Sequence, residues 1–493
     1  MIRARRIVAS RVNILLVALM FIVLLFSIFI KPKSLETRMI LSFDEILYNK
    51  MANQIRIDLT DYNGLSFYKY IKRRNPNLTL PGYFTKPLFK HPPMYSLILT
   101  LPKRLGFEKP KEANYFSFYV ALLLPFLAFF IAWQLFDKRT AFFAFLFLSI
   151  EPVYWLCSLR VWMGCTLTLF MYLSILFFIL GWKNDKYYIL SGVFLGFSLL
   201  TKYTGVLVAP IILIFAATYK PELFRNIKFY LIFIIAFLIF MPWIIWNIKV
   251  YGNFLSTIMF HKDTSTDILN KDALFMDKLT LLIEKPHYMI FLLLSGLAMY
   301  WVAFKGYIAR IEQGIRRNEI LSVAAVVLFL IFIFSLKDVK QGFIETILLN
   351  KLPPISQDYP NPFINEPWSF YIGHFLKMSP IFILSYLGLF FLNSRNEGDK
   401  LLLVAVLLIF LFCIIWKGNQ SRYALSAIFA LTILASRSFF WFWDALGRIR
   451  EIFFRRLLKS MSICVIFYFF LKTAIVGIKL TTTFGGEGYF TYF

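Results

Sequence analysis

An acidic pair and a proline turn are the residues of this chain best suited to chemistry. Asp44 and Glu45 follow the first apolar stretch of the sequence, and His91 precedes Pro92 and Pro93 further along the same polar segment. A carboxylate at a membrane boundary can accept a proton from a hydroxyl group, and a helix start flanked by cations can bind a phosphate. Together they favour an enzyme that uses a lipid-phosphate donor. The alternative is that both are ordinary loop residues.

The acidic pair begins a predicted amphipathic helix over residues 42 to 57, which we expect to lie on the membrane surface. Its apolar residues recur at helical spacing: Phe43, Ile46, Leu47, Met51 and Ile55. Ser42 followed by Glu45 is a capping-box pattern, so capping and chemistry explain Glu45 equally well. Asp44 falls in the first turn, where the helix dipole favours the carboxylate form. It is therefore placed to act as a base.

Cations surround the proline turn. Lys86, Lys90 and His91 flank Pro92 and Pro93, and the apolar run that follows is predicted to be a helix. Proline is preorganised for a helix start, and the free amides there attract anions. The alternative is a basic juxtamembrane turn that contacts lipid headgroups.

Composition dictates what must position these residues. The chain is 59% hydrophobic and 19% aromatic, with a mean hydropathy of +0.68, too apolar for a soluble globule of 493 residues. The stretch from 12 to 30 follows four arginines and lacks a cleavage site, so it is predicted to be an uncleaved signal anchor with a cytoplasmic N-terminus. We expect residues 1 to 493 to form one all-α polytopic domain in the plasma membrane of a prokaryote.

Apolar stretches long enough to span a bilayer recur along the whole chain. With the first, about thirteen are expected: 114 to 136, 140 to 157, 164 to 182, 187 to 201, 203 to 219, 229 to 247, 287 to 304, 320 to 336, 379 to 392, 401 to 416, 423 to 443 and 461 to 478. Lysines and arginines in the short cytoplasmic turns agree with this topology. It leaves long outward loops at 31 to 113, 248 to 286 and 337 to 378.

The net charge of +26 comes partly from those cytoplasmic turns, yet the first outward loop is basic too. Nucleic acid is a poor partner for so apolar a chain, whereas an anionic lipid or lipid-linked phosphate suits it. The four cysteines lack paired spacing, and the outward loops contain no Asp-x-Asp pair. We therefore expect no disulfide, no metal and no cofactor, and disfavour a metal-dependent oligosaccharyltransferase.

Five patterns occur in an order that resembles the protein O-mannosyltransferase and aminoarabinose-transferase group of the GT-C glycosyltransferase superfamily, which uses polyprenyl- or dolichyl-phosphate sugars. They are Phe43-Asp44-Glu45 with Tyr48 and Ala52; His91-Pro92-Pro93-Met94; Gly192 to Gly205 with Lys202; Pro242-Trp243 with Trp246-Asn247 and Tyr251-Gly252-Asn253; and Arg422-Tyr423-Ala424-Leu425. One departure stands out. The family usually has an Asp after the position of Arg160, where this chain has Val161-Trp162-Met163-Gly164.

The resemblance implies roles for named residues. Asp44 would be the general base, and Glu45 would support it or bind sugar. The donor phosphate would be bound by His91, Lys202, Arg160 and Arg422, whose charge stabilises the leaving group, with Lys86 beside the same turn. For Lys202 and Arg160, contact with lipid headgroups is an equally good explanation. Contacts with sugar or acceptor would fall to Tyr48, Trp368 and Tyr371.

The predicted function is transfer of a sugar, mannose or a related hexose or pentose, to a hydroxyl group on the extracytoplasmic side. The acceptor would be a protein, glycan or lipid, with loop 337 to 378 as lid or acceptor contact; a disordered loop is the alternative there. A transporter or lipid flippase is the main rival, since many spans suit it equally well. We see no internal repeat, however, and the distinctive charges lie at span ends rather than mid-membrane. A noncatalytic scaffold would leave the ordered motifs unexplained.

Overall fold

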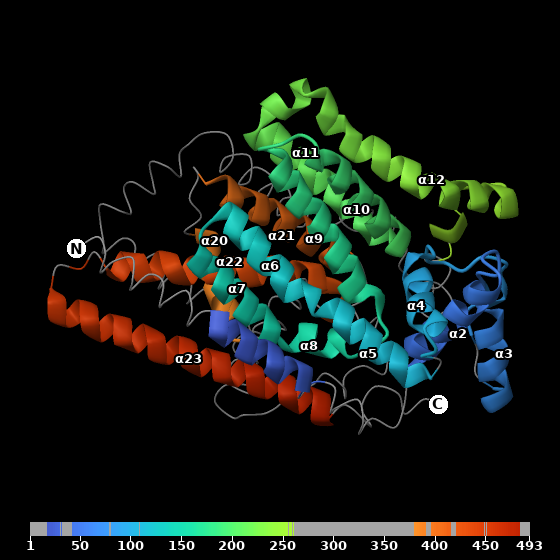
Figure 1. The fold of residues 1–493 in the computed structure, drawn as a ribbon, viewed down its shortest axis with the longest axis horizontal. Helices are drawn as coiled ribbons and strands as arrows, with labels where there is room; N and C mark the ends of the chain where they lie inside the picture. The colour runs from blue at the N-terminus through green and yellow to red at the C-terminus, as the bar shows by residue number, and fades with distance from the viewer. Residues whose placement is uncertain are drawn as a thin grey trace, which may run out of the picture.

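Helices make up every regular element that the structure describes (Figure 1). The computed structural model describes residues 17–29, 31, 42–77, 80–107, 109–254, 256–258, 260, 379–390, 396–415, 421–447, 449 and 451–483. Within these residues the all-α prediction is confirmed. The expected spans at 287 to 304 and 320 to 336, and the loop 337 to 378, lie outside them.

Five helices are long and apolar enough to cross a membrane: Glu112–Leu135, Met163–Gly181, Ile227–Tyr251, Arg422–Leu446 and Ile452–Ile478. A sixth span results if the bent pair Lys138–Ile150 and Pro152–Ser158, which meet at 63°, is counted as one. Each coincides with a stretch expected from hydropathy, and the chain is a multi-pass membrane protein. The expected total of about thirteen spans is not confirmed.

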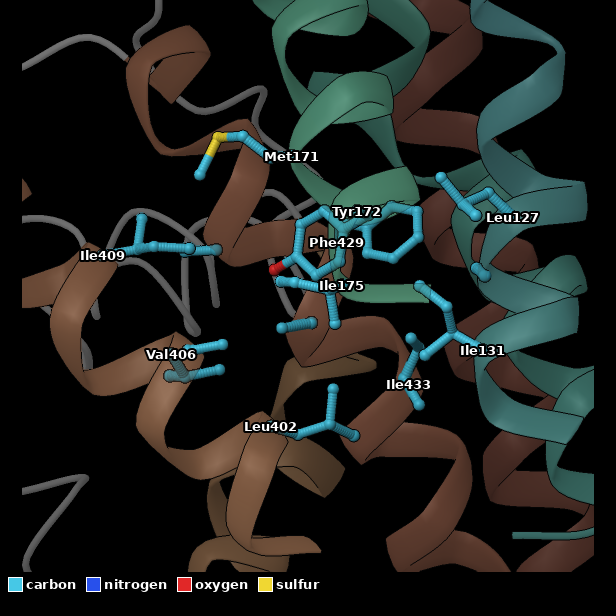
Figure 2. Close-up of a cluster of buried hydrophobic side chains, with 14 of the residues drawn as sticks. Leu127, Ile131, Met171, Tyr172, Ile175, Leu402, Val406, Ile409, Phe429 and Ile433 are labelled. Atoms are coloured by element: carbon cyan, nitrogen blue, oxygen red, sulfur yellow. The ribbon is translucent and has the colours of Figure 1, made fainter. Parts of the chain in front are cut away.

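The membrane part contains these helices: α5 (Pro110–Ala121), α6 (Leu123–Leu135), α7 (Lys138–Ile150), α8 (Pro152–Ser158), α9 (Met163–Gly181), α10 (Tyr187–Thr201), α11 (Val208–Tyr219), α12 (Leu231–Tyr251), α20 (Phe382–Phe390), α21 (Glu397–Ile415), α22 (Leu425–Leu446) and α23 (Ile452–Thr483). The core lies where α6, α9, α21 and α22 meet (Figure 2). There Tyr172 stacks on Phe429 with ring centroids 4.0 Å apart. Such packing joins the two halves of the described chain.

The short pair α10 and α11 brings a lysine into the interior. A 3-10 turn, η2 (Tyr203–Leu207), separates the two helices, and Lys202 is the C-cap of α10. Small residues let α12 approach α10 closely, because a Cβ added at Gly192 would lie 2.7 Å from the Ile232 carbonyl oxygen. Lys202 thus caps a helix that packs closely on α12.

The first outward loop folds into α2 (Phe43–Ile57), α3 (Leu65–Arg74), the turn η1 (Gly82–Thr85) and α4 (Met94–Arg104), gathered at one end of the molecule (Figure 1). The predicted amphipathic helix is confirmed as α2. Its place on the membrane surface stays a prediction. Leu47, Met51 and Ile55 are buried in one cluster with residues of α3 and α4. The apolar stripe therefore covers protein rather than lipid.

Candidate functional site

The start of α2 is built by the predicted capping box. The Ser42 amide donates to Glu45 Oε2 at 2.7 Å, and the Glu45 amide donates to the Ser42 hydroxyl at 3.4 Å. This reciprocal pair satisfies two amides that the first helical turn leaves without partners. It also fixes the direction in which the neighbouring Asp44 side chain leaves the helix.

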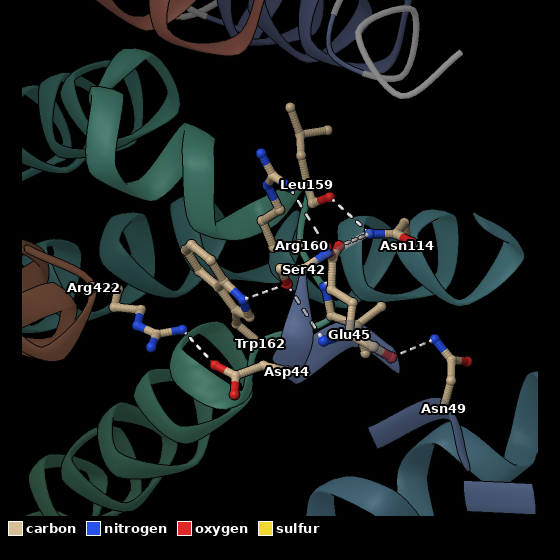
Figure 3. Close-up of polar contacts among 10 residues, drawn as sticks. Ser42, Asp44, Glu45, Asn49, Asn114, Leu159, Arg160, Trp162 and Arg422 are labelled. Atoms are coloured by element: carbon tan, nitrogen blue, oxygen red, sulfur yellow. Dashed lines mark hydrogen bonds and ion pairs between the residues drawn. The ribbon is translucent and has the colours of Figure 1, made fainter. Parts of the chain in front are cut away.

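Glu45 is fully buried in a polar network that joins three segments (Figure 3). Asn114 of α5 donates to Glu45 Oε1 and also to the Leu159 carbonyl oxygen at 3.0 Å. The Val161 amide donates to Oε1 at 3.3 Å, and Arg160 Nη1 lies 3.5 Å from Oε2. A buried carboxylate needs such partners, because an unpaired charge inside a protein is costly. Glu45 therefore binds α2 to α5 and to the segment after α8.

Asp44 points the other way and forms an ion pair with Arg422, whose Nη1 lies 2.6 Å from Asp44 Oδ2 (Figure 3). The Asp44 side chain remains 32% exposed, against 0% for Glu45, so Asp44 is the carboxylate of the pair that a substrate can reach. Trp162 places its ring 4.6 Å from the Arg422 guanidinium and donates to Ser42 at 3.3 Å. The start of α2 and the segment before α22 thus meet at this point.

Lys202 joins the same group through Tyr423, over whose ring its Nζ lies at 4.5 Å. The Arg422 guanidinium also lies 5.2 Å from that ring. Burial, with the like charge of Arg422, lowers the pKa of Lys202 to about 8, and Asp44 opposes this shift. Lys202 and Arg422, far apart in sequence, therefore form one positively charged patch beside Asp44.

Two tyrosines, Tyr62 and Tyr251, hold the segment with the proline turn by hydrogen bonds to its backbone. Tyr62 accepts the Phe89 amide on its own carbonyl oxygen at 2.9 Å and donates its hydroxyl to the Pro92 carbonyl oxygen at 3.1 Å. The Tyr251 hydroxyl, from the end of α12, accepts the Leu88 amide at 2.9 Å. His91, within this segment, is buried with its ring edge against Phe89. The turn is therefore rigidly placed.

Lys90, which precedes His91, reaches the charged group. Its Nζ lies 3.0 Å from the Tyr83 hydroxyl and 4.2 Å from the centre of that ring. Burial lowers the pKa of Lys90 to about 8; Asp44 opposes this, and the charges of Lys202 and Arg422 add to it. In the part of the chain that the structure describes, three cations and one partly exposed carboxylate thus lie within electrostatic reach. Such a group can bind an anion next to a base.

Comparisons with known proteins identify a family that matches part of this chain. The family described as dolichyl-phosphate-mannose-protein mannosyltransferase matches residues 90–246, about a third of the chain. The matched region contains the proline turn, Arg160 and Lys202. The search of curated proteins gave no match.

Solved structures share the fold. AglB from Archaeoglobus fulgidus, an archaeal oligosaccharyltransferase in complex with an inhibitory peptide and a dolichol-phosphate, has a TM-score of 0.57 at 16% identity, covering 96% of this chain and 56% of its own. ArnT from Cupriavidus metallidurans has a TM-score of 0.54 at 14% identity in the apo state, covering 97% of this chain and 77% of its own. The structure of ArnT bound to undecaprenyl phosphate has a TM-score of 0.52 at 14% identity, covering 96% of this chain and 78% of its own. The chain spans just over half the length of AglB.

The resemblance to the GT-C glycosyltransferases is confirmed. The site residues predicted from sequence do not all lie in one place in this fold. Asp44, Lys202 and Arg422 come together as described, while Arg160 is buried against Glu45. Its predicted contact with the phosphate stays a prediction.

Four further predicted residues lie at the edge of the group or outside the residues that the structure describes. Lys86 is exposed. Tyr48 is buried, with its ring edge against Tyr95 at 5.2 Å between centroids. Trp368 and Tyr371 lie outside the described residues. Their roles also stay predictions.

Sequence reasoning missed four residues of the site. Asn114 and Tyr83 carried no motif, and Lys90 was noted only as a flanking charge. Trp162 did carry a signal, since it belongs to the segment in which this chain departs from the family pattern. Its ring now faces the Arg422 guanidinium, an attractive cation–π contact. The departure from the motif thus marked a neighbour of Arg422.

Proposed function

We propose that this GT-C protein is a glycosyltransferase that moves a sugar from a polyprenyl- or dolichyl-phosphate to a hydroxyl group of an acceptor on the outward side of the membrane. The observation that carries the proposal is the partly exposed Asp44 held by Arg422, with Lys202 beside them. It is supported by AglB and ArnT, whose structures contain a dolichol-phosphate and undecaprenyl phosphate. The proline turn favours mannose as the sugar.

The reaction follows from the charges. Asp44 accepts the proton of the acceptor hydroxyl, and the oxygen forms a bond to the anomeric carbon. The bond from that carbon to the phosphate oxygen breaks, and both its electrons leave with the phosphate, which gains one negative charge. Lys202 and Arg422, together with His91 of the rigid turn, stabilise that charge. As Asp44 becomes neutral, Arg422 is released from its ion pair and its charge becomes available to the phosphate.

The remaining residues serve to position this centre. Glu45 caps α2 and, with Arg160 as its counterion, fixes the helix start from which Asp44 projects. Acceptor recognition is assigned to the outward loops, with Trp368 and Tyr371 of loop 337 to 378 as contacts. The assignments of Trp368, Tyr371 and the loop rest on the sequence.

Replacing Asp44 with Asn tests the base directly. The change keeps the shape of the side chain and removes its basicity, so sugar transfer should fall by roughly a hundredfold to ten-thousandfold. Binding of undecaprenyl phosphate, measured on the same purified protein, should persist because no cation is lost. Asp58→Asn is the matched control, since Asp58 is the exposed C-cap of the same helix. Substantial turnover by the Asp44 variant would disprove the assignment.

A further inference from the structure

One indole ring contacts both arginines of the site. The guanidinium of Arg422 lies 4.6 Å from the centre of the Trp162 ring, and that of Arg160 lies 5.9 Å from it. In the view of Figure 3 the ring lies between the two guanidinium groups. Cations are attracted to the face of an aromatic ring, most strongly to that of tryptophan. Trp162 therefore attracts two like charges while it keeps them apart.

Each arginine has a carboxylate of its own. Arg422 Nη1 lies 2.6 Å from Asp44 Oδ2. Arg160 Nη1 lies 3.5 Å from Glu45 Oε2. The two carboxylates are neighbours in one helix turn, so an arginine free to move between them could pair with either. The Trp162 ring holds each guanidinium on its own side and so keeps the two pairs distinct.

The position of Trp162 is itself fixed by the backbone around it. Trp162 is the N-cap residue of α9, and its indole N–H donates to the Ser42 hydroxyl at 3.3 Å, which ties it to the start of α2. Two residues further on, a Cβ added at Gly164 would lie 3.6 Å from the Arg422 carbonyl oxygen. The segment that departs from the family pattern therefore lies against the helix start that carries the base and against the backbone of the arginine that pairs with it.

We propose that Trp162 is a positioning residue for sugar transfer, which holds the Arg422 guanidinium on Asp44 and keeps Arg160 on Glu45. The proposal rests on the proposed function for the identity of the reaction. Only 6% of the Trp162 surface is exposed, so the residue acts through Arg422 rather than by contact with sugar or acceptor. The proposal also gives a role to the segment in which this chain lacks the aspartate of the family pattern.

The effect should fall on the chemical step rather than on donor binding. Before the reaction Arg422 is paired with Asp44, so its charge contributes less to binding of the lipid phosphate. In the transition state Asp44 takes up a proton while the phosphate gains charge, and the guanidinium must then be in place. Displacement of a charged group by about an ångström is enough to lose much of its contribution. We therefore expect kcat to fall more than KM rises.

The test measures mannose transfer from undecaprenyl-phosphate mannose to a threonine-containing peptide by the full-length protein in detergent. Trp162→Leu should lower kcat roughly tenfold to a hundredfold, and change the KM for the donor by less than about threefold. Trp162→Phe keeps an aromatic ring beside Arg422 and loses the indole N–H, so it should retain most of the activity. Wild-type kcat in Trp162→Leu, or a loss that falls on KM alone, would overturn the proposal.

A double-mutant cycle shows whether Trp162 acts through Arg422. Arg422→Gln removes the charge that Trp162 positions, so adding Trp162→Leu to it should lower kcat further by less than about threefold. If the two losses multiply in full, Trp162 acts independently of Arg422 and the proposal is wrong. Trp162→Met, whose flexible side chain adapts to irregular space, replaces Trp162→Leu if the leucine variant does not fold.

Trp182→Leu is the matched control. Trp182 is the C-cap residue of the same helix α9, and the Lys220 Nζ lies 4.6 Å from the centre of its ring. The change removes an indole beside a cation at the opposite end of the helix, so it reproduces the loss of packing without touching Arg422. Its kcat should equal that of the wild type. Equal losses of kcat in Trp182→Leu and Trp162→Leu would assign the effect to packing in general and overturn the proposal.

The wild type tests the proposed function in the same assay. A wild type that transfers no mannose and releases no undecaprenyl phosphate would contradict the proposed function and the role of Trp162 together. Normal transfer by both the wild type and Trp162→Leu would contradict the role of Trp162 alone.

Discussion

Two adjacent carboxylates in this protein have opposite environments, and their position in one helix turn explains why. Glu45 occupies the N3 position of a capping box and is turned into the protein, while Asp44 is turned toward Arg422 and remains partly exposed. The cap could be predicted because its partners are three residues apart and belong to a known local pattern. The partners Arg160 and Arg422 could not be assigned from spacing, because only tertiary folding brings them to α2.

At the residue scale, the buried pair of Glu45 and Arg160 predicts a stability effect distinct from that of Asp44. Glu45→Gln leaves the Arg160 charge buried without its carboxylate, which should cost about 3 kcal/mol. Removal of the half-exposed Asp44 carboxylate by Asn should cost about 1 kcal/mol or less. Thermal unfolding in detergent measures both. Adding Arg160→Gln to Glu45→Gln should cost less than Arg160→Gln alone, and strictly additive losses would show that the pair is not coupled.

At the scale of elements, hydropathy predicted where helices run but not what they pack against. Apolar periodicity is the same whether a stripe faces lipid or protein, so the sequence alone could not show that the apolar stripe of α2 is covered by α3 and α4. The expected span at 140 to 157 is broken at Glu151, where α7 ends and α8 begins with Pro152. Proline is favoured at a first helical position and lacks the amide to continue α7, which accounts for the break. Pro152 is therefore the one residue of this stretch that indicates the break between α7 and α8 from sequence.

The close contact between α10 and α12 should be sensitive to a single methyl group. Gly192→Ala would place its Cβ 2.7 Å from the Ile232 carbonyl oxygen, so the two helices must separate. We expect a stability loss of about 1 to 3 kcal/mol and reduced sugar transfer, because Lys202 caps α10. Gly82→Ala is the control, since a Cβ there meets nothing within 4 Å. Unchanged stability and transfer in Gly192→Ala would contradict the view that this packing positions Lys202.

At the scale of the whole molecule, the fold class followed from composition and the site did not. An apolar chain with repeated long hydrophobic stretches must bury them in lipid, and five or six such helices are found among the described residues. The charge of +26 predicted an anionic partner in general terms. The site proposed for that partner depends on tertiary folding, which brings together α2, the proline turn, the end of α10 and the segment before α22.

The central claim is that this molecule breaks the bond between a lipid phosphate and a sugar, and one measurement tests it most directly. The purified wild-type protein is reconstituted with a polyprenyl-phosphate sugar, an acceptor is added, and free polyprenyl phosphate and glycosylated acceptor are both quantified. The account predicts that the two products appear together in equal amounts, that neither forms without acceptor, and that Asp44→Asn stops both. Movement of the intact lipid-linked sugar across the bilayer, with no release of polyprenyl phosphate, would identify a flippase and contradict the account.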